Sequence, residues 1–313
     1  MDKIAIIDMG TNTFHLLIAE VKEGNFRALL KEKVSVKIGQ GGINKGLITK
    51  DAWQRAIDCL LHFREVIDKE GVEKVFATAT SAIRNAKNGK ALTKEIFEKT
   101  AIPVRIISGD QEAELIYFGV KKALDIGSET SLIMDIGGGS VEFIICNQDT
   151  IFWKQSFEIG AQRLLDMFHY HDPIISEEVS NLNLLLNEKL RPLTQAVAEF
   201  KPSVLIGSSG TFDTLSDIYQ MENGIERAPN ATEFPLSFES YWPIHQEIIE
   251  KKKEERLKIP GMIEMRVDMI VVACCLIQFV LDKYQIKQLR VSAYALKEGV
   301  LFNTLEQLQP QKG

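Results

Sequence analysis

Short apolar runs, each followed by turn-forming residues, open the chain. Residues 3–8 and 14–21 form two such runs with a polar turn between them, and residues 26–39 form a third in which lysines alternate along one face. Runs rich in β-branched residues with period-two alternation are typical of strands. The pattern therefore predicts three consecutive strands.

Helical spacing begins after the third strand. Thr49 is suited to cap a long helix with apolar residues at every third or fourth position, and Gly71 is suited to end it. Ser108 and Gln111 fit a capping box that opens another helix, running to about Leu124. Between these helices the pattern predicts a strand at 74–80, a helix at 90–100 and a strand at 104–108.

The same order begins again after a short link at residues 125–130. A strand, a glycine-rich turn and a second strand are predicted within residues 131–146. The later elements are predicted as a strand at 150–160, helices at 161–169 and 176–200, a strand at 203–210, a polar loop at 220–235, a buried helix at 266–284, a strand at 288–293 and a last helix from about 295.

The turns after the first strand of each half align without gaps. Asp8 matches Asp135 and Thr13 matches Ser140, at a constant offset of 127 residues, the difference between positions 8 and 135. A repeat that spans a whole domain indicates a duplicated unit rather than a solenoid. We therefore predict an α/β fold of two like domains, each with a mixed five-stranded sheet flanked by helices, whose turns lie on opposite walls of one cleft.

Composition narrows the class of protein. A chain of 313 residues with 45% hydrophobic and 26% charged residues is long enough for two ordinary globular domains. The formal net charge of −6 argues against general duplex DNA binding, which needs a broad basic field. It leaves room for an anionic ligand, because backbone amides can hold phosphate without net positive charge.

Nothing in the sequence predicts a membrane or export segment. The apolar run at 269–281 is shorter than the roughly 20 residues that a bilayer span requires, so we interpret it as a core helix. The chain begins directly with a predicted strand and shows no signal-peptide pattern. Its four cysteines have no disulfide or metal spacing, and the adjacent Cys274 and Cys275 are typical of buried thiols. We predict a cytoplasmic protein.

The turns are predicted to bind phosphate. Glycines and small hydroxyl residues in a tight turn leave backbone N–H groups accessible to an anion. The segment at 207–211 is a third candidate, although alone it is equally compatible with an ordinary βα loop. The predicted phosphate-binding residues are Gly10, Thr11, Asn12, Thr13, Gly137, Gly138, Gly139, Ser140, Gly207, Ser208, Ser209, Gly210 and Thr211.

Carboxylates beside the turns predict a cation. Asp8 and Asp135 end their strands at the turns, where a lone carboxylate would repel phosphate, and Glu142 lies on the same strand face as Ser140. Mg²⁺ relieves such repulsion, because it binds through one or two carboxylates plus phosphate oxygens. We predict Mg²⁺ or another divalent cation at Asp8, Asp135 and Glu142. His15, which matches Glu142 in the repeat, is interpreted as a packed strand residue.

Glu112 and Arg84 are the candidate catalytic residues. Glu112 lies in the first turn of a helix, where it can accept a proton from water or merely complement the helix dipole. Arg84 follows a strand and precedes a turn, where it can hold phosphate or remain a solvated loop residue. Lys31, Lys33 and Lys37 and the basic run at 251–258 offer a possible binding track for a polymeric anion. The alternative is that they are solvated faces, as such runs usually are.

Six segments together resemble the exopolyphosphatase/guanosine pentaphosphate phosphatase (Ppx/GppA) family of the actin/Hsp70/sugar-kinase superfamily. In family order they read AIIDMGTNTFHLLIAEV, ATATSAIRNAKN, IISGDQEAELIYFGV, MDIGGGSVEFII, IGSSGT and LRVSAYALKEGVL. The resemblance implies two duplicated actin-like (ribonuclease H-like) domains with phosphates and Mg²⁺ in an interdomain cleft. It also implies that Glu112 is the catalytic glutamate and that Arg84 contacts phosphate.

The resemblance implies an activity and a domain plan. The expected enzyme releases terminal orthophosphate from inorganic polyphosphate, or the 5′ γ-phosphate from guanosine pentaphosphate. An ATP-dependent kinase of the same superfamily and a non-enzymatic alarmone-binding sensor are the alternatives, and a homodimer is left open. The expected domains are 1–125, onto which a C-terminal helix at about 299–313 packs back, and 126–298.

Some residues depart from the family pattern. The family tends to show Ser-Asp and Arg-Glu-Gly near its end, whereas this chain has Ser292-Ala293 and Lys297-Glu298-Gly299, and Ala273 stands where Gly is usual. These changes concern substrate detail and local packing. The chain resembles the short two-domain form, so processive handling of very long polymer is less expected.

Overall fold

The computed structural model describes residues 2–22, 25–228 and 230–308. The chain forms two compact units, called here unit 1 (Met1–Gly119 with Leu296–Gly313) and unit 2 (Val120–Ala295). Each unit has its own sheet and its own hydrophobic core. No helix among the described residues is both long and apolar enough to cross a bilayer.

Unit 1 contains three strands followed by alternating helices and strands. Thr49 caps the first long helix, as predicted, by accepting a hydrogen bond from the Ala52 amide at 3.4 Å, an interaction typically worth about 1 kcal/mol. The elements are β1 (Asp2–Met9), β2 (Thr13–Lys22), β3 (Asn25–Ser35), a short 3₁₀ turn (Ile43–Lys45), α1 (Lys50–Lys69), β4 (Lys74–Ala79), α2 (Ser81–Asn85), α3 (Gly89–Thr100), β5 (Val104–Ile106), α4 (Gly109–Ala123, which continues into unit 2) and α12 (Leu296–Leu308).

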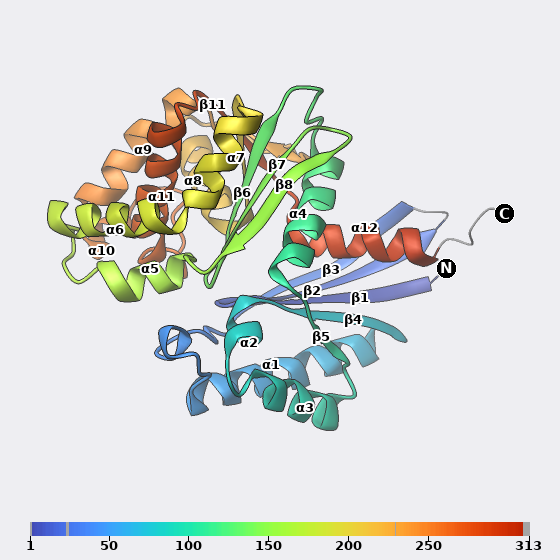
Figure 1. Ribbon diagram of the computed structural model, residues 1–313. Helices are drawn as coiled ribbons and strands as arrows, with labels where there is room; N and C mark the ends of the chain where they lie inside the picture. Colours follow the sequence, from blue (N-terminus) through green and yellow to red (C-terminus); the bar gives the residue numbers. More distant parts are fainter. Residues whose placement is uncertain (1, 23–24, 229, 309–313) are drawn as a thin grey trace. The chain divides into compact units, whose positions relative to one another are not determined.

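The sheet of unit 1 has helices on both faces. Its strand order is β3-β2-β1-β4-β5, in which β1 pairs antiparallel with β2 and parallel with β4. Figure 1 shows α1 and α3 on one face and α12 on the other, where it packs against β1 and β2. Ala5, Ile7 and Met9 alternate into the core beneath α1, because every second side chain of a strand points to the same face.

Unit 2 repeats this plan with additional helices. Its elements are β6 (Ser131–Ile136), β7 (Val141–Cys146), β8 (Ile151–Phe157), α5 (Ala161–Phe168), α6 (Ser176–Lys189), α7 (Arg191–Phe200), β9 (Val204–Ser208), α8 (Ser209–Glu222), β10 (Glu233–Phe234), α9 (Phe238–Glu250), α10 (Lys253–Arg256), α11 (Met269–Tyr284) and β11 (Gln288–Ser292). The predicted buried helix is α11, on which residues 270–277 are all buried.

The duplication is confirmed by the strand pairing. Omitting β10, the order in unit 2 is β11-β9-β6-β7-β8, which matches β5-β4-β1-β2-β3 of unit 1. In the antiparallel pairs, Asp8 lies opposite His15 and Asp135 lies opposite Glu142, so the offset of 127 residues holds on both strands. The units therefore have the duplicated actin-like, ribonuclease H-like arrangement that was expected.

Four local expectations were wrong. The second sheet has six strands rather than five, because Glu233–Phe234 of the polar loop pairs with the end of β11. The third strand ends at Ser35 rather than 39, and the helix predicted at 176–200 is interrupted at Leu190, just before Pro192, which cannot donate a backbone hydrogen bond. Arg84 lies on the short helix α2 rather than in a loop.

Candidate active site

The carboxyl ends of three parallel strands meet in unit 1. The Thr80 amide, after β4, donates to the Met9 carbonyl at the end of β1 (3.4 Å), and the Ile107 amide, after β5, donates to the Ala79 carbonyl (3.2 Å). In open α/β sheets, ligands bind at this edge. Asp8, Arg84 and Glu112 are on β1 or on the segments that follow β4 and β5, so the topology brings all three to one edge.

Arg84 and Glu112 form an ion pair that the sequence did not predict. Arg84 Nη1 lies 2.7 Å from Glu112 Oε2 and 3.3 Å from the Ile107 carbonyl, and only 15% and 8% of the two side chains are exposed. The predicted capping box holds the start of α4, since Ser108 and Gln111 exchange bonds of 3.2 Å. Glu112 is thus a buried carboxylate on a fixed helical turn, and the guanidinium of Arg84 lies against it.

The turn at 10–13 presents backbone amides on one side. The Thr11 carbonyl accepts from the Gly39 amide at 3.1 Å, and the Asn12 carbonyl accepts from the amides of Val36 (3.0 Å) and Lys37 (2.8 Å). In a trans peptide the N–H of the next residue points opposite to the carbonyl. The amides of Asn12 and Thr13 therefore point away from the segment 36–39, as an anion nest requires.

The turn at 137–140 is built in the same way with a different backing. The carbonyls of Gly137 and Gly138 accept from the Ala161 and Gln162 amides at the start of α5, both at 2.9 Å. The Gly139 carbonyl accepts from Arg163 Nε at 2.8 Å. Because three successive carbonyls point to α5, the three amides that follow them, through that of Ser140, point away from it. This turn therefore also has the backbone geometry of an anion nest.

Two buried carboxylates lie side by side beside the second nest. Asp135 and Glu142 are directly opposite each other on β6 and β7, and their side chains are 6% and 1% exposed. Ser208 donates to Asp135 Oδ2 and Ser156 donates to Glu142 Oε1, both at 2.6 Å. Directly opposed like charges, roughly 5 Å apart at Cβ, repel each other, and a divalent cation between them would remove that repulsion. The donor set therefore fits Mg²⁺.

Unit 1 offers fewer carboxylates to a cation than unit 2 does. Asp8 lies opposite His15 and beside Thr78 of β4, so a single carboxylate stands at the corresponding place. Among the described residues no group of three or more His, Cys, Asp or Glu side chains has the geometry of a metal site. A cation here would be held by one or two carboxylates and completed by substrate oxygens, which is how proteins usually hold Mg²⁺.

The segment 207–211 is a strand end that continues directly into a helix. Ser208 is the N-cap of α8, and Gly210 and Thr211 lie in its first turn. The Ser208 hydroxyl is used to hold Asp135, so it acts as an orienting group for a carboxylate. The N-terminus of α8 is therefore next to Asp135, where the helix dipole and the first-turn amides, which have no acceptor within the helix, favour an anion.

Sequence reasoning missed Arg266, a buried cation beside α8. A Cβ at Gly210 would overlap the Arg266 guanidinium, so only glycine allows this approach. Burial lowers the pKa of Arg266 and the charges of Asp213 and Asp135 raise it in part. Among the described residues Arg266 Nε has no hydrogen-bond partner. The one available signal was an arginine three residues before a helix that opens with a long apolar run, which alone is weak.

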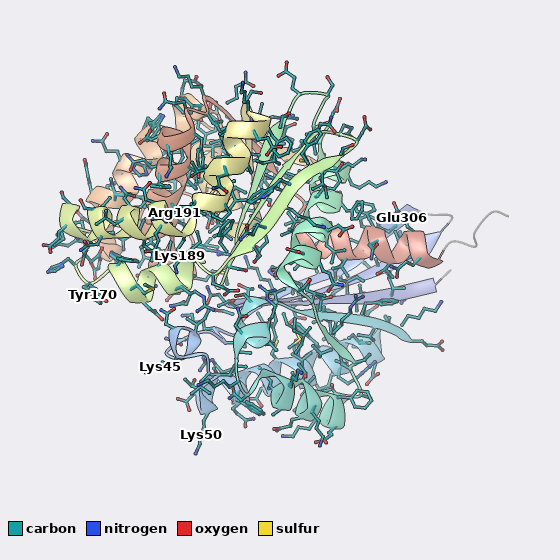
Figure 2. The ribbon with its side chains drawn as sticks, in the orientation of Figure 1. Lys45, Lys50, Tyr170, Lys189, Arg191 and Glu306 are labelled. Atoms are coloured by element: carbon teal, nitrogen blue, oxygen red, sulfur yellow. The ribbon has the colours of Figure 1, made fainter. Side chains whose placement is uncertain are left out.

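The basic run at 251–258 does not form a free basic face. Arg256 is fully buried; its Nη1 lies 2.7 Å from Asp172 Oδ1, and its Nε donates to the Val267 carbonyl at 3.0 Å. Lys253 pairs with Asp268 at 2.7 Å. These residues join two loops of unit 2. Two other basic residues of unit 2, Lys189 and Arg191, lie at the break between α6 and α7 (Figure 2).

Fold and site together define a class of protein. Each unit has the actin-like fold, with a carboxylate near the end of its first strand and a following turn whose amides have the geometry of an anion nest, as in phosphate-handling proteins of this fold. The chain is a member of the Ppx/GppA phosphatase family, whose model matches residues 17–308. It is accordingly a hydrolase of the phosphatase type.

Two solved structures support the same placement. A crystal structure of an exopolyphosphatase from Cytophaga hutchinsonii is 45% identical to this chain, with a TM-score of 0.95 and coverage of 98% of this chain and 99% of the other. A crystal structure of the Aquifex aeolicus member of the Ppx/GppA family is 26% identical, with a TM-score of 0.80 and coverage of 99% of both chains. The similarity extends over essentially whole chains.

Proposed function

We propose that the protein hydrolyses the terminal phosphoanhydride bond of inorganic polyphosphate and releases orthophosphate. The observation that carries this proposal is the buried Arg84–Glu112 ion pair at the strand edge that also holds the turn at 10–13. The likeness to the Cytophaga hutchinsonii exopolyphosphatase at 45% identity supports polyphosphate as the substrate. Guanosine pentaphosphate is the second candidate, because the family name covers both enzymes.

Phosphate oxygens would be bound chiefly by backbone amides. The amides of Asn12 and Thr13 in unit 1 and those that follow Gly137 in unit 2 are fixed by carbonyls bonded to their backing segments, so they need no reorganisation when an anion arrives. We propose that each unit is one copy of the duplicated domain and that each turn binds phosphate oxygens. Thr13 and Ser140 add hydroxyl donors.

Glu112 would act on the water and Arg84 on the phosphate. A carboxylate on a fixed helical turn can orient a water for in-line attack and accept its proton. Arg84 can shift a donor from Glu112 to an equatorial phosphate oxygen, which frees the carboxylate for the water as the substrate binds. The exchange keeps Arg84 paired with an anion throughout. Asp8, at the same edge of the sheet, would face the negative charge of the substrate.

Asp135 and Glu142 would hold Mg²⁺, with Ser208 and Ser156 fixing their orientation. When bound, the cation neutralises charge on the phosphate chain and the leaving group. Asp8 is proposed as a further ligand. The hydroxyls of Ser208 and Ser156 matter because removing a group that orients a metal ligand typically costs about 10–100-fold in metal affinity.

The proposed place of action is the cytoplasm. All four cysteines are free and buried, and burial raises the pKa of Cys59, Cys146 and Cys275 to about 12. Unreactive thiols of this kind suit a reducing compartment and place no demand on disulfide formation.

Orthophosphate release tests the proposal. The purified protein is assayed with tripolyphosphate, long-chain polyphosphate, guanosine pentaphosphate and ATP, with Mg²⁺ and with Mg²⁺ removed by EDTA. We expect release from tripolyphosphate that EDTA abolishes. Transfer of labelled γ-phosphate from ATP to a sugar would instead indicate a kinase, and tight alarmone binding without any release would indicate a sensor.

A further inference from the structure

A cavity of about 500 Å³ lies in unit 1, outside the residues assigned to catalysis. Its floor is the edge of the sheet formed by β4 and β5, and its walls are α4 and α12. Drug-sized and cofactor-sized ligands usually occupy pockets of about 300–1,000 Å³, so its size suits a small organic molecule. The lining includes neither Asp8, Arg84 nor Glu112.

The cavity opens where two helices cross and diverge. Gly299 of α12 lies against the Leu115 carbonyl of α4 so closely that a Cβ at 299 would overlap it. On one side of this contact each helix turns a continuous face to the cavity, with residues at i, i+3, i+4 and i+7. These are Gln111, Glu114, Leu115 and Phe118 on α4 and Val300, Asn303, Thr304 and Gln307 on α12.

The lining combines aromatic rings with hydrogen-bonding groups. Phe76 and Phe118 supply flat apolar surfaces, and the amides of Asn303 and Gln307 each offer a donor and an acceptor. Thr78 and Thr304 line the cavity although each is only 6% exposed. No hydrogen bond among the described residues uses either hydroxyl. Neither hydroxyl is among the described atoms that are shut off from solvent without a partner, so both are open to the cavity and can bond to a polar ligand.

The charges of the lining do not favour a polyanion such as polyphosphate. Arg105 and Glu114 are its charged residues, and their formal charges cancel. A polyphosphate chain would meet one guanidinium and one repelling carboxylate, which is a poor match for several negative charges. An uncharged ligand with a flat ring and a hydrogen-bonding edge matches the rings, amides and hydroxyls together.

We propose that this cavity is a regulatory site for a neutral nucleoside. The base would lie against the phenylalanine rings, with its edge read by the amides of α12, and the ribose hydroxyls would meet Thr78 and Thr304. This proposal goes beyond the hydrolysis of polyphosphate. Binding at the cavity can be measured whether or not that activity is found.

Two contacts connect the cavity to the catalytic edge. Ile107 lines the cavity, and its carbonyl accepts a hydrogen bond from Arg84 at 3.3 Å. Thr78 lines the cavity and is the β4 neighbour of Asp8. Gln111 and Glu114 also bracket Glu112 on α4. A nucleoside that moves any of these groups would change the Arg84–Glu112 pair, so binding should alter turnover.

Calorimetric titration with adenosine, guanosine and uridine tests the proposal. At least one of them should bind with one site per chain and change the rate of phosphate release from tripolyphosphate. Asn303→Phe, which fills the cavity, should weaken that binding by about tenfold or more and remove the effect on rate. Thr304→Val, a smaller change, should weaken binding with the fold intact by circular dichroism.

Glu306→Phe is the matched control, because Glu306 is exposed on the same helix (Figure 2). It should leave nucleoside binding unchanged. Failure of all three nucleosides to bind at millimolar concentration would overturn the proposal. So would binding that survives both Asn303→Phe and Thr304→Val, or binding that tripolyphosphate competes away completely, since either result would locate the nucleoside elsewhere.

Discussion

The two hairpin turns share a backbone design and differ in the side chains around them. In both units the turn carbonyls bond to the segment that follows the third strand, which leaves the amides on the other side. Across the strand pair, however, Asp8 faces His15 whereas Asp135 faces Glu142. The two units therefore share the backbone geometry of an anion nest and differ in the charged residues beside it. Unit 1 carries the Arg84–Glu112 pair, and unit 2 carries two opposed carboxylates suited to a cation.

The backing segments also differ in how much change they tolerate. A Cβ on Gly160, just before α5, would overlap the Gly138 backbone, which cannot move without distorting the turn. A Cβ on Gly39 would lie 2.6 Å from Thr11 Cγ2 and 3.1 Å from Ile43 Cδ1, which are side-chain atoms rather than backbone. The nest of unit 2 is therefore held by rigid backbone packing, and that of unit 1 by a more adaptable contact.

The largest expected effect is the loss of catalysis when Glu112 of unit 1 is changed. Glu112→Gln keeps the shape of the side chain but removes the charge that receives the proton, so kcat for phosphate release should fall by about 10²–10⁴-fold. Asp110→Asn, in the same helical turn, is the matched control and should retain most activity. An active Glu112→Gln enzyme, with wild-type KM and pH profile, would reject the assignment of catalysis to unit 1.

The Mg²⁺ dependence of activity should depend on the opposed carboxylates of unit 2, Asp135 and Glu142. Glu142→Gln should raise the Mg²⁺ concentration needed for half-maximal activity by on the order of 10–100-fold. Without metal, the same change should raise the melting temperature, because it removes a buried like-charge repulsion. His15→Gln, at the corresponding place in unit 1, should leave Mg²⁺ dependence nearly unchanged. Equal effects of the two substitutions would contradict the division between the units.

The smallest of these contrasts concerns the backing glycines. Gly160→Ala should reduce the free energy of unfolding by about 1–3 kcal/mol and weaken phosphate binding, because backbone must shift to admit the methyl group. Gly39→Ala should cost less, since Thr11 can change rotamer. Urea denaturation of both variants measures the contrast, and a greater loss in Gly39→Ala would show that the adaptable contact has been misassigned.

Repetition made much of the fold predictable from sequence. Two turns in register at a fixed offset predicted the duplication, and alternating apolar positions predicted the strands from which the sheets follow. The capping residues Thr49 and Ser108 behave as local rules require. Local rules failed where the secondary structure of a segment depends on bonds to backbone that is distant in the sequence. Residues 36–39 leave the sheet to bond the turn at 10–13, and Glu233–Phe234 becomes a strand only because β11 offers an edge.

The site was predictable as a set of residues and less so as a set of contacts. The position of Glu112 at a helix start was visible in sequence, but its pairing with Arg84 joins residues 28 apart and depends on the strand order. The opposition of Asp135 and Glu142 follows from hairpin register. Arg266 and Ser156 were missed, and Ser208 was named as a phosphate-binding residue without its bond to Asp135, since a buried arginine or an orienting hydroxyl has no local signature.

The central claim is that the duplicated turns bind phosphate oxygens, and calorimetry with tripolyphosphate tests it most directly. In the Glu112→Gln background, which should bind without turnover, we predict binding of tripolyphosphate in the presence of Mg²⁺. Thr13→Val and Ser140→Ala should each weaken that binding, because each removes a hydroxyl donor from one of the turns. Binding that neither substitution changes would contradict the account.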